Sequence, residues 1–554
     1  MNGAGSETRA AWWAHSDGAL ARLLSALAAG QGRVVLRWRD RDLESEEVLN
    51  AVAGTVTAMA TTGIGRGDVV AVLVAPNSPD MLIARWAANL LGAAVCHLRS
   101  ANPVSAAATL SDQARLAVLE RIRADVLFTD QENEDAAYRL LRARAGGAVA
   151  VLGLDVRRAR SVRVRPGELP PTGILAPLDP DALACVAFTT GTTGLPKGIR
   201  FPLRVWENTV AGVERMMPGA PRLLCTTPLD NTVGPMVQSA LARGGSVVLH
   251  ERFDPCAVAG AIAAQRITEL FLATPFLHRL LDCCRAEHYD LSSLRAVIYG
   301  GSPADPARLQ EAVHRLGSVL VQGYGTTETG VISVLLPAEH RDRRLLSTVG
   351  RPLPHVNVEV REPGSGPESG PADCGEIWVR SPHMMTGYLG EPDSTAQVLR
   401  DGWFRTGDIG RLDEQGYLHL LDRVDDVVKI AGVKVYPAVV EQALIRLLGV
   451  AEAAVLGVRT SDQVEHLCAA LVMQPGAHVT AKDVRAHLRA QLSDAHVPED
   501  IQVLQELPLT PTGKPDRRRL RQLWRGNGAP RGPGDCLHPD PLVASTATES
   551  EHDQ

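Results

Sequence analysis

The residues with the clearest capacity for chemistry form a loop rich in glycine and threonine, Thr189 to Gly198. Glycines let backbone amides come close to a polyphosphate, threonine hydroxyls add hydrogen-bond donors, and a lysine adds a positive charge. The spacing differs from that of a P-loop. Because the loop directly follows the apolar run Cys185 to Phe188, we interpret it as a phosphate-binding loop rather than a flexible turn. Its candidate binding residues are Thr189, Thr190, Gly191, Thr192, Thr193, Gly194 and Lys197.

Two further loops place polar side chains beside glycines. In the segment 322–328, Tyr324 lies between two glycines, so that its ring can offer a flat face to a purine. In the same segment Thr327 can donate to a phosphate and Glu328 can bind Mg²⁺. Asp408 ends another glycine-containing turn, where its carboxylate can accept hydrogen bonds from both ribose hydroxyls. Taken alone, each pattern also fits an ordinary turn or a capping aspartate.

Two segments near the C-terminal end carry lysine. The segment 421–432 is a charged run that includes Asp425 and Lys429, and by itself it fits a solvated linker face. The segment 508–516 is rich in turn-forming residues and displays Lys514. Taken alone, Lys514 fits an exposed loop residue better than a catalyst.

The elements that must position these loops alternate between strands and helices. Apolar runs at 69–76, 125–130, 185–190, 246–250, 269–274 and 294–301 predict buried strands, and the segment 81–95 between the first two predicts a helix. This alternation predicts an α/β fold in which parallel sheets are layered with helices. In such sheets, ligands bind beyond the carboxyl ends of the strands.

The pattern changes from about Ile377 onward. Short strand-like runs joined by turns are followed by two helix-and-strand units, with helices expected near 438–448 and 481–492. We therefore predict a large N-terminal domain, 1–422, and a small α+β domain, 423–525, joined by a hinge. The segment 526–554 is rich in Gly, Pro and Ser without apolar periodicity, which is typical of a disordered tail.

Composition excludes several classes of protein. The formal net charge of −6 gives no basic excess for binding nucleic acid or an anionic membrane. No run approaches the ~18 apolar residues of a membrane span, and the N-terminus lacks the pattern of a secretory signal. The nine cysteines are scattered, which favours packing roles and a reducing cytoplasm. The adjacent pair Cys283 and Cys284 suits neither a tetrahedral metal site nor an ordinary disulfide.

Taken together and in this order, the five motifs resemble those of the acyl-adenylate-forming superfamily, and the resemblance covers roughly residues 20–522. That superfamily includes acyl- and aryl-CoA ligases, adenylation domains of peptide synthetases, and beetle luciferases. The resemblance implies an AMP-forming acid–thiol ligase that uses ATP and Mg²⁺. It implies that an acyl-adenylate forms with release of pyrophosphate, and that the acyl group then passes to an acceptor.

The resemblance also implies a role for each matching residue. Gly300, Gly301 and Ser302 would bracket the adenine with Tyr324, and Gly325 and Thr326 belong to the same nucleotide-binding set. Thr327 would contact the α-phosphate, Glu328 would bind Mg²⁺, and Asp408 and Arg423 would hold the ribose. Lys514 would bridge the carboxylate and the α-phosphate during adenylation, and Asp425 would be the hinge. Lys429 and Gly432 would belong to the face that replaces Lys514 when the small domain rotates.

The motifs do not identify the acyl group or the acceptor to which it passes. The candidate acyl pocket comprises Asn231, Gly323 and Gly330, and Asp230 and Asn231 replace the aromatic residue and the histidine that many CoA ligases carry there. This departure argues against an ordinary fatty acid, while an amino acid, an aromatic acid or a helix-capping role for Asn231 remain alternatives. Coenzyme A is the first choice of acceptor by analogy, followed by a carrier-protein phosphopantetheine and by an amine. A non-catalytic nucleotide-binding regulator is the alternative from a different class, although it would not need Lys514.

Overall fold

The computed structural model describes most of the chain. The described residues are 12–13, 18–98, 111–144, 149–158, 161–171, 173–175, 177–189, 197–216, 219–230, 233–286, 288–302, 304–362, 372–424, 426–430, 433–459, 465–477, 479–509 and 515–526. The predicted tail beyond 526 lies outside these ranges.

The first large sheet is parallel apart from its last strand. Within the described residues its order is β7-β6-β5-β3-β4-β8-β9, and only β9 pairs with its neighbour in the antiparallel sense. The strands are β3 (Val69–Leu73), β4 (Ala94–His97), β5 (Val126–Thr129), β6 (Ala150–Gly153), β7 (Val162–Arg163), β8 (Leu183–Thr189) and β9 (Lys197–Pro202). The apolar, β-branched runs of β3, β4, β5 and β6 are buried, as expected for parallel strands covered on both faces, whereas the edge strand β7 is exposed.

The second large sheet has the order β16-β15-β14-β13-β12-β10-β11-β1-β2 among the described residues, with antiparallel strands at both edges. The strands are β1 (Val34–Trp38), β2 (Arg41–Glu44), β10 (Arg222–Cys225), β11 (Ser246–Leu249), β12 (Glu269–Ala273), β13 (Ala296–Gly300), β14 (Leu320–Thr326), β15 (Gly330–Leu335) and β16 (Arg351–Pro352). The predicted fold class is therefore confirmed.

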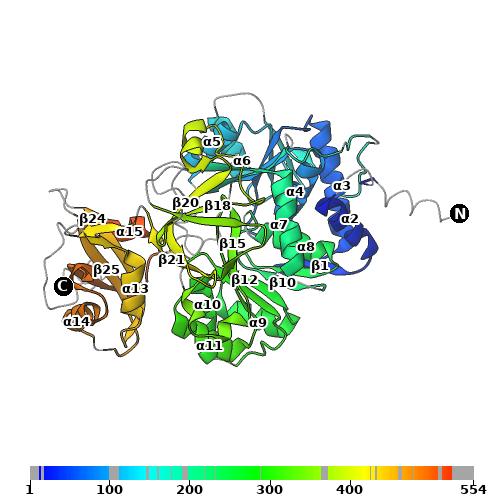
Figure 1. Cartoon of the computed structure of the whole chain (residues 1–554). Helices are drawn as coiled ribbons and strands as arrows, with labels where there is room; N and C mark the ends of the chain where they lie inside the picture. Colours follow the sequence, from blue (N-terminus) through cyan, green and yellow to red (C-terminus); the bar gives the residue numbers. More distant parts are fainter. Residues whose placement is uncertain are drawn as a thin grey trace, which may run out of the picture.

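Helices cover both sheets, and four of them share one hydrophobic core with strands of the two sheets (Figure 1). These four are α2 (Ala19–Ala29), α3 (Ser45–Thr61), α4 (Pro79–Leu90) and α8 (Val233–Ala242). The other helices of this part are α5 (Asp112–Ile122), α6 (Glu134–Ala143), α7 (Leu203–Met216), α9 (Pro255–Gln265), α10 (Thr274–Ala286), α11 (Pro306–Leu316) and α12 (Pro392–Val398). The helix predicted for 81–95 is shorter than expected, because its last residues begin strand β4.

A third, antiparallel sheet leads from the large unit toward the small one. Its strands are β17 (Asn357–Arg361), β18 (Gly375–Arg380), β19 (Leu399–Arg400), β20 (Trp403–Leu412) and β21 (Leu418–Arg423). Strand β20 lies at its centre and pairs with β18, β19 and β21. This sheet places β20 and β21 between the two parts of the molecule (Figure 1).

The small C-terminal unit combines strands and helices and has its own core (Figure 1, orange to red). It comprises β22 (Val428–Ile430), β23 (Val433–Val435), α13 (Pro437–Ile445), β24 (Val450–Arg459), β25 (Glu465–Met473), α14 (Ala481–Gln491), β26 (Asp500–Leu504) and α15 (Arg517–Gly526). Helices α13 and α14 match the two that the sequence predicts there. No helix in the described part of the chain has both the length and the apolar character needed to cross a bilayer.

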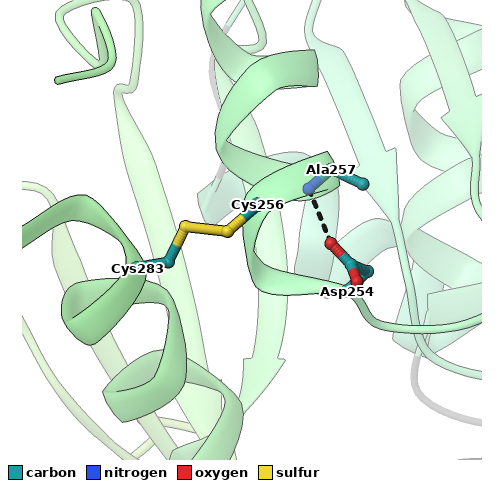
Figure 2. Close-up of a disulfide and its surroundings, with 4 residues drawn as sticks. All are labelled: Asp254, Cys256, Ala257 and Cys283. Carbon is teal, nitrogen blue, oxygen red and sulfur yellow. Dashed lines mark hydrogen bonds between the residues drawn. A yellow bond between two sulfur atoms is a disulfide. The ribbon is translucent and has the colours of Figure 1, made fainter. Parts of the chain in front are cut away.

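One cysteine prediction is wrong. Cys256 at the start of α9 and Cys283 on α10 form a disulfide, with Cα atoms 6.0 Å apart (Figure 2). The cause is tertiary: α9 begins at the Asp254 cap, whose carboxylate accepts from the amide of Ala257, and α10 packs alongside it. Cys283 therefore pairs with a cysteine 27 residues away in the sequence. The sequence analysis considered only the adjacent pair Cys283 and Cys284 and missed this partner.

Candidate active site

Two predicted glycine segments lie side by side at the carboxyl ends of β13 and β14. Gly300 pairs with Gly323 in register, and a Cβ atom at Gly300 would lie 2.2 Å from the carbonyl oxygen of Gly323. Gly301 has φ of +87°, a backbone conformation that favours glycine. A flat, open surface without side chains results, which suits the close approach of a planar ring.

Tyr324 joins this surface to the third sheet. Its hydroxyl donates a 2.7 Å hydrogen bond to Oδ2 of Asp408 on β20. Burial, followed by the nearby Asp408 carboxylate, raises the pKa of Tyr324 well above its usual value, so the phenol keeps its proton and remains the donor. The ring of Tyr324 is therefore fixed in place by the same carboxylate that we predict for ribose binding.

Asp408 is also held from its other side. Its carboxylate lies 3.7 Å from Nε of Arg423, the residue that pairs with it across β20 and β21. Its amide donates to the Thr406 hydroxyl at 3.0 Å. The three predicted residues Tyr324, Asp408 and Arg423 thus meet at one place, although the chain separates the first two by 84 residues.

Glu328 and Lys197 converge on an aromatic residue that the sequence analysis missed. The hydroxyl of Tyr388 donates to Oε1 of Glu328 at 3.1 Å, and Nζ of Lys197 lies 4.9 Å from the centre of the same ring. Burial and the neighbouring Glu328 carboxylate raise the pKa of Tyr388 above its usual value. A signal was available, because Tyr388 follows Gly387 as Tyr324 follows Gly323.

The turn between β14 and β15 is closed by its own threonines. The amide of Thr326 donates to the Thr329 hydroxyl at 3.3 Å, and the amide of Thr329 donates to the Thr326 hydroxyl at 3.2 Å. The Thr326 hydroxyl is thus engaged in shaping the turn. Thr327 and Glu328 lie half-buried between these two threonines, where the turn presents them outward.

The two glycines of the candidate acyl pocket have different surroundings. A Cβ atom at Gly323 would meet no atom within 4 Å, so there is open space beside it. At Gly330, with φ of +68°, a Cβ atom would lie 2.9 Å from Cβ of His383. Nε2 of His383 is 2.8 Å from Nε2 of His355, and burial together with His355 and Arg215 lowers the pKa of His383 to about 4. This neutral histidine pair was not predicted.

In the small unit, ion pairs join helix α15 to Asp426, the residue after the predicted hinge. Asp426 lies 3.2 Å from Nη2 of Arg521 and 3.7 Å from Nε of Arg517. Arg517 also bonds Glu441 of α13 at 3.1 Å. Because Arg517 follows Lys514 by three residues, this network links the segment after Lys514 to the residue after the predicted hinge.

Several predicted residues lie outside the described ranges. They are Thr190, Gly191, Thr192, Thr193, Gly194, Asn231, Asp425, Gly432 and Lys514. Only the backbone is described for Thr189, which ends β8 and pairs with Lys197 on β9, and for Lys429, which lies in β22. The predicted site residues that the structure describes in full therefore belong mainly to the nucleotide side of the site.

Comparisons with known proteins identify the family of the chain. Residues 25–389 match the AMP-binding enzyme family, and residues 439–514 match the AMP-binding enzyme C-terminal domain. The chain is 32% identical to a feruloyl-CoA synthase from an Amycolatopsis species, over 86% of this chain and 93% of the relative. It is 36% identical to the solved amide bond synthetase McbA from Marinactinospora thermotolerans, with a TM-score of 0.81 over 91% of this chain and 99% of that one. The o-succinylbenzoate coenzyme A synthetase from Bacillus subtilis, solved with ATP and magnesium ion, is 26% identical, with a TM-score of 0.73 over 90% of this chain and 99% of that one.

Proposed function

Because the chain belongs to the AMP-binding enzyme family, we propose that it activates a carboxylic acid as an acyl-adenylate and then transfers the acyl group to coenzyme A. The observation that carries the proposal is the meeting of Tyr324, Asp408 and Arg423 beside the glycine surface of β13 and β14. This set offers a purine face and a ribose acceptor in one place, which is what binding of the adenosine part of ATP needs.

We assign the adenosine-binding roles from this geometry. The adenine lies against the glycines 300, 301 and 323 and the ring of Tyr324, with Ser302 at the rim. Asp408 accepts from the ribose hydroxyls, and Arg423 lies beside the Asp408 carboxylate and orients it. Gly325 admits the close approach of β15, since a Cβ atom there would lie 2.0 Å from the Gly330 carbonyl oxygen.

The residues at the turn fit a magnesium-bound triphosphate. Mg²⁺ prefers hard oxygen ligands and is commonly held by one or two carboxylates together with substrate phosphates. Glu328 supplies one such carboxylate, and Lys197 places a cation on the far side of Tyr388. When bound, Mg²⁺ neutralises phosphate charge. We propose that Thr327 donates to the α-phosphate and that residues of the segment 189–197 supply further phosphate-binding groups.

The first half-reaction brings two anions together. A carboxylate oxygen of the acid attacks the α-phosphorus, the bond to the bridging oxygen of pyrophosphate breaks, and pyrophosphate leaves with the electron pair. We propose that Lys514 bridges the carboxylate and the α-phosphate and stabilises the charge that grows on the phosphate oxygens. Cations and backbone donors that are already in place lower this barrier, because they need no reorganisation during the reaction.

The second half-reaction needs Lys514 out of the way. We propose that the small domain, 423–525, rotates about Asp425 relative to the large domain, 1–422, and brings Lys429 and Gly432 to the site. The thiol then attacks the acyl carbonyl, and AMP leaves with the oxygen that came from the acid. The proposed location is the cytoplasm, because the reaction consumes ATP. The net charge of −6 supports a small-molecule enzyme without a nucleic-acid or membrane partner.

An amine is the second candidate acceptor. The observation that favours it is the 36% identity to an amide bond synthetase over nearly the whole of both chains. The replacement of the usual histidine by Asn231, next to Asp230, sets this chain apart from many CoA ligases at the same place. A carrier-protein phosphopantetheine is a third candidate, whose thiol chemistry equals that of coenzyme A.

The test measures products for each acceptor separately. The purified protein is incubated with ATP, Mg²⁺, a panel of acids, and either coenzyme A or a primary amine. We expect AMP and pyrophosphate in equal amounts, with a thioester as the acyl product. Lys514→Ala should slow adenylate formation by roughly 10²-fold yet still consume a pre-made acyl-adenylate. Lys482→Ala, which alters an exposed lysine on α14, is the matched control.

Each outcome decides between the candidates. Faster turnover with the amine than with coenzyme A would replace the thiol by the amine as acceptor. Formation of ADP and phosphate, or an absence of acid-dependent AMP, would overturn the proposed function.

A further inference from the structure

Three polar side chains that the mechanism above does not use gather in the interior. Arg85 lies in the middle of α4 and is 2% exposed, and His97 ends β4 and is 7% exposed. Asp230 follows β10 and is half-buried. Arg85 and His97 lie on consecutive elements, whereas Asp230 is far from both in the sequence, and the charge of Arg85 acts on both of the others.

These groups have hydrogen-bonding capacity that the protein does not fill. Nη1 of Arg85 and both ring nitrogens of His97 have no partner in the part of the chain that the structure describes. The Arg85 guanidinium lies 4.2 Å from the centre of the Trp206 ring, and Nη2 is 3.6 Å from Sγ of Cys185. No ion pair joins Arg85 to Asp230 across the described residues. Buried polar groups are nearly always hydrogen-bonded, so this concentration of unused groups calls for a functional reason.

The location points toward the acyl group. Asp230 directly precedes Asn231, the residue we assign to the acyl pocket. Cys185 lies on β8, the strand that leads into the phosphate loop. Asn77 fixes the chain between β10 and Asp230, because its side chain donates to the Thr227 carbonyl at 3.0 Å and accepts from the Leu229 amide at 3.1 Å. The cluster is thus built at the carboxyl ends of β3, β4 and β10, where ligands of such sheets bind.

Gly234 packs directly against Nη1 of Arg85. A Cβ atom at Gly234 would lie 3.0 Å from Nη1 and 2.9 Å from the Trp206 ring. A side chain at 234 would therefore displace Arg85 or Trp206. Glycine at this position keeps the guanidinium against the first turn of α8, where backbone amides add to its positive charge.

We propose that Arg85, His97 and Asp230 form a subsite that receives a neutral hydrogen-bonding group on the acyl chain, a hydroxyl in the simplest case. This inference rests on the proposed function, and it assigns hydroxy-substituted acids as the preferred substrate class. A hydroxyl accepts from Nη1 of Arg85 and donates to Asp230 or to the free nitrogen of His97. It is the smallest group that satisfies a donor and an acceptor together.

Other acyl chains fit the cluster less well. A plain hydrocarbon chain would leave the guanidinium and the imidazole without partners. An anionic substituent would meet the Asp230 carboxyl group as well as Arg85. Burial and the Arg85 charge lower the pKa of His97 well below its usual value, so the imidazole is neutral and offers one donor and one acceptor.

The test compares acids that differ only in hydroxyl against methyl. Acid-dependent exchange of labelled pyrophosphate into ATP is measured with 4-hydroxybenzoate against 4-methylbenzoate, 4-hydroxycinnamate against 4-methylcinnamate, and 10-hydroxydecanoate against undecanoate. In at least one pair the wild type should favour the hydroxy acid by about 10²-fold in kcat/KM, because a site with buried polar groups rejects a ligand that leaves them unpaired. Arg85→Met should reduce that preference to less than about threefold while it keeps or raises the rate with the methyl acid.

Arg361→Met supplies the control, and His97→Leu supplies a second variant. Arg361 is another buried arginine stacked on a tryptophan, but it pairs with Glu359 in the third sheet, so its loss should leave the preference unchanged. His97→Leu should lose the preference in the same pair as Arg85→Met. Equal rates within every pair in the wild type, or a preference that persists in both variants, would overturn this subsite. Absence of exchange with every acid would overturn the proposed function itself.

Discussion

At the scale of single residues, the proposed nucleotide site predicts that Tyr324 and Asp408 act together in ATP binding. The Tyr324→Phe variant keeps the ring but removes the 2.7 Å hydrogen bond to Asp408. Because a hydrogen bond to a charged group contributes about 1.5–3 kcal/mol, we expect Kd for ATP to rise by about tenfold or more. Isothermal calorimetry with ATP measures this directly.

A variant of Asp408 separates its two proposed roles, as the ribose acceptor and as the hydrogen-bond partner of Tyr324. Asp408→Ala removes the ribose acceptor as well as the partner of Tyr324, so it should weaken ATP binding more than Tyr324→Phe does. Tyr417→Phe, which removes a 2.8 Å bond to Glu339, is a control outside the site. Unchanged ATP affinity in Asp408→Ala would show that the ribose assignment is wrong.

Asp230 predicts a pH-dependent stability. Burial raises its pKa to about 7, against about 3.9 in an unfolded chain. Between these values the folded protein holds a proton that the unfolded chain has lost, so stability falls as pH rises from about 4 to about 7, by at most about 1.4 kcal/mol per pH unit. Asp230→Asn should remove this loss. Its Tm relative to the wild type should therefore be higher at pH 8 than at pH 5, and a pH-independent difference would contradict the assignment.

The limits of sequence reasoning are clearest at this scale. Tyr324, Glu328 and Asp408 were predictable, because each lies beside glycines in a loop that follows a strand. For Tyr388 the preceding glycine was a signal, but its contact with Glu328, 60 residues away, was not predictable. His383 was not predictable, because no local pattern encodes its contact with His355. Arg85 was hidden inside an apolar helix, where its unfilled hydrogen-bonding capacity becomes visible only in three dimensions.

At the scale of elements, the proposed rotation of the small domain depends on a change of backbone torsion at Asp425. Proline fixes φ near −65° and removes an amide donor, so Asp425→Pro should trap one geometry. We expect the adenylating geometry to persist, with pyrophosphate exchange retained and transfer to the acceptor strongly reduced. Asp425→Asn keeps the torsional freedom and serves as the matched control. Normal acyl transfer by Asp425→Pro would place the hinge elsewhere.

The network around Arg517 predicts a cost in stability for the small unit. Arg517→Met leaves the partly buried carboxylates of Glu441 and Asp426 without one of their cations. Removal of one partner costs about 3–5 kcal/mol in a fully buried ion pair, so we expect a smaller loss here, which urea denaturation can measure. The double variant Arg517→Met/Glu441→Gln should recover part of the loss. A loss as large in the double variant as in the single one would show that the Glu441 pair does not hold α15.

Elements were easier to predict from the sequence than their ends and partners. Strands β3, β11 and β12 lie where their apolar runs predicted them, because buried parallel strands need continuous apolar side chains. The end of α4 was misplaced, since the apolar run continues without a break into β4. The Cys256–Cys283 disulfide depends on the packing of α9 against α10, which no spacing in the sequence reveals.

At the scale of the whole molecule, two units share one reaction. The large unit holds the glycine surface, the Tyr324–Asp408 pair and the Glu328 turn, while the small unit carries the segment that leads to Lys514. Two separate units suit this chemistry, because Lys514, the cation proposed to assist adenylation, would obstruct the acceptor in the second step. Both steps pass through one covalent intermediate, the acyl-adenylate.

An isotope experiment tests directly whether the acyl-adenylate forms. The acid is labelled with ¹⁸O in both carboxylate oxygens and converted with ATP and coenzyme A, and the AMP is analysed by mass spectrometry. If the carboxylate attacks the α-phosphorus, one labelled oxygen must remain on AMP when the thiol displaces it. We expect AMP that carries one ¹⁸O for each thioester formed. Unlabelled AMP, or label in pyrophosphate or phosphate, would contradict it.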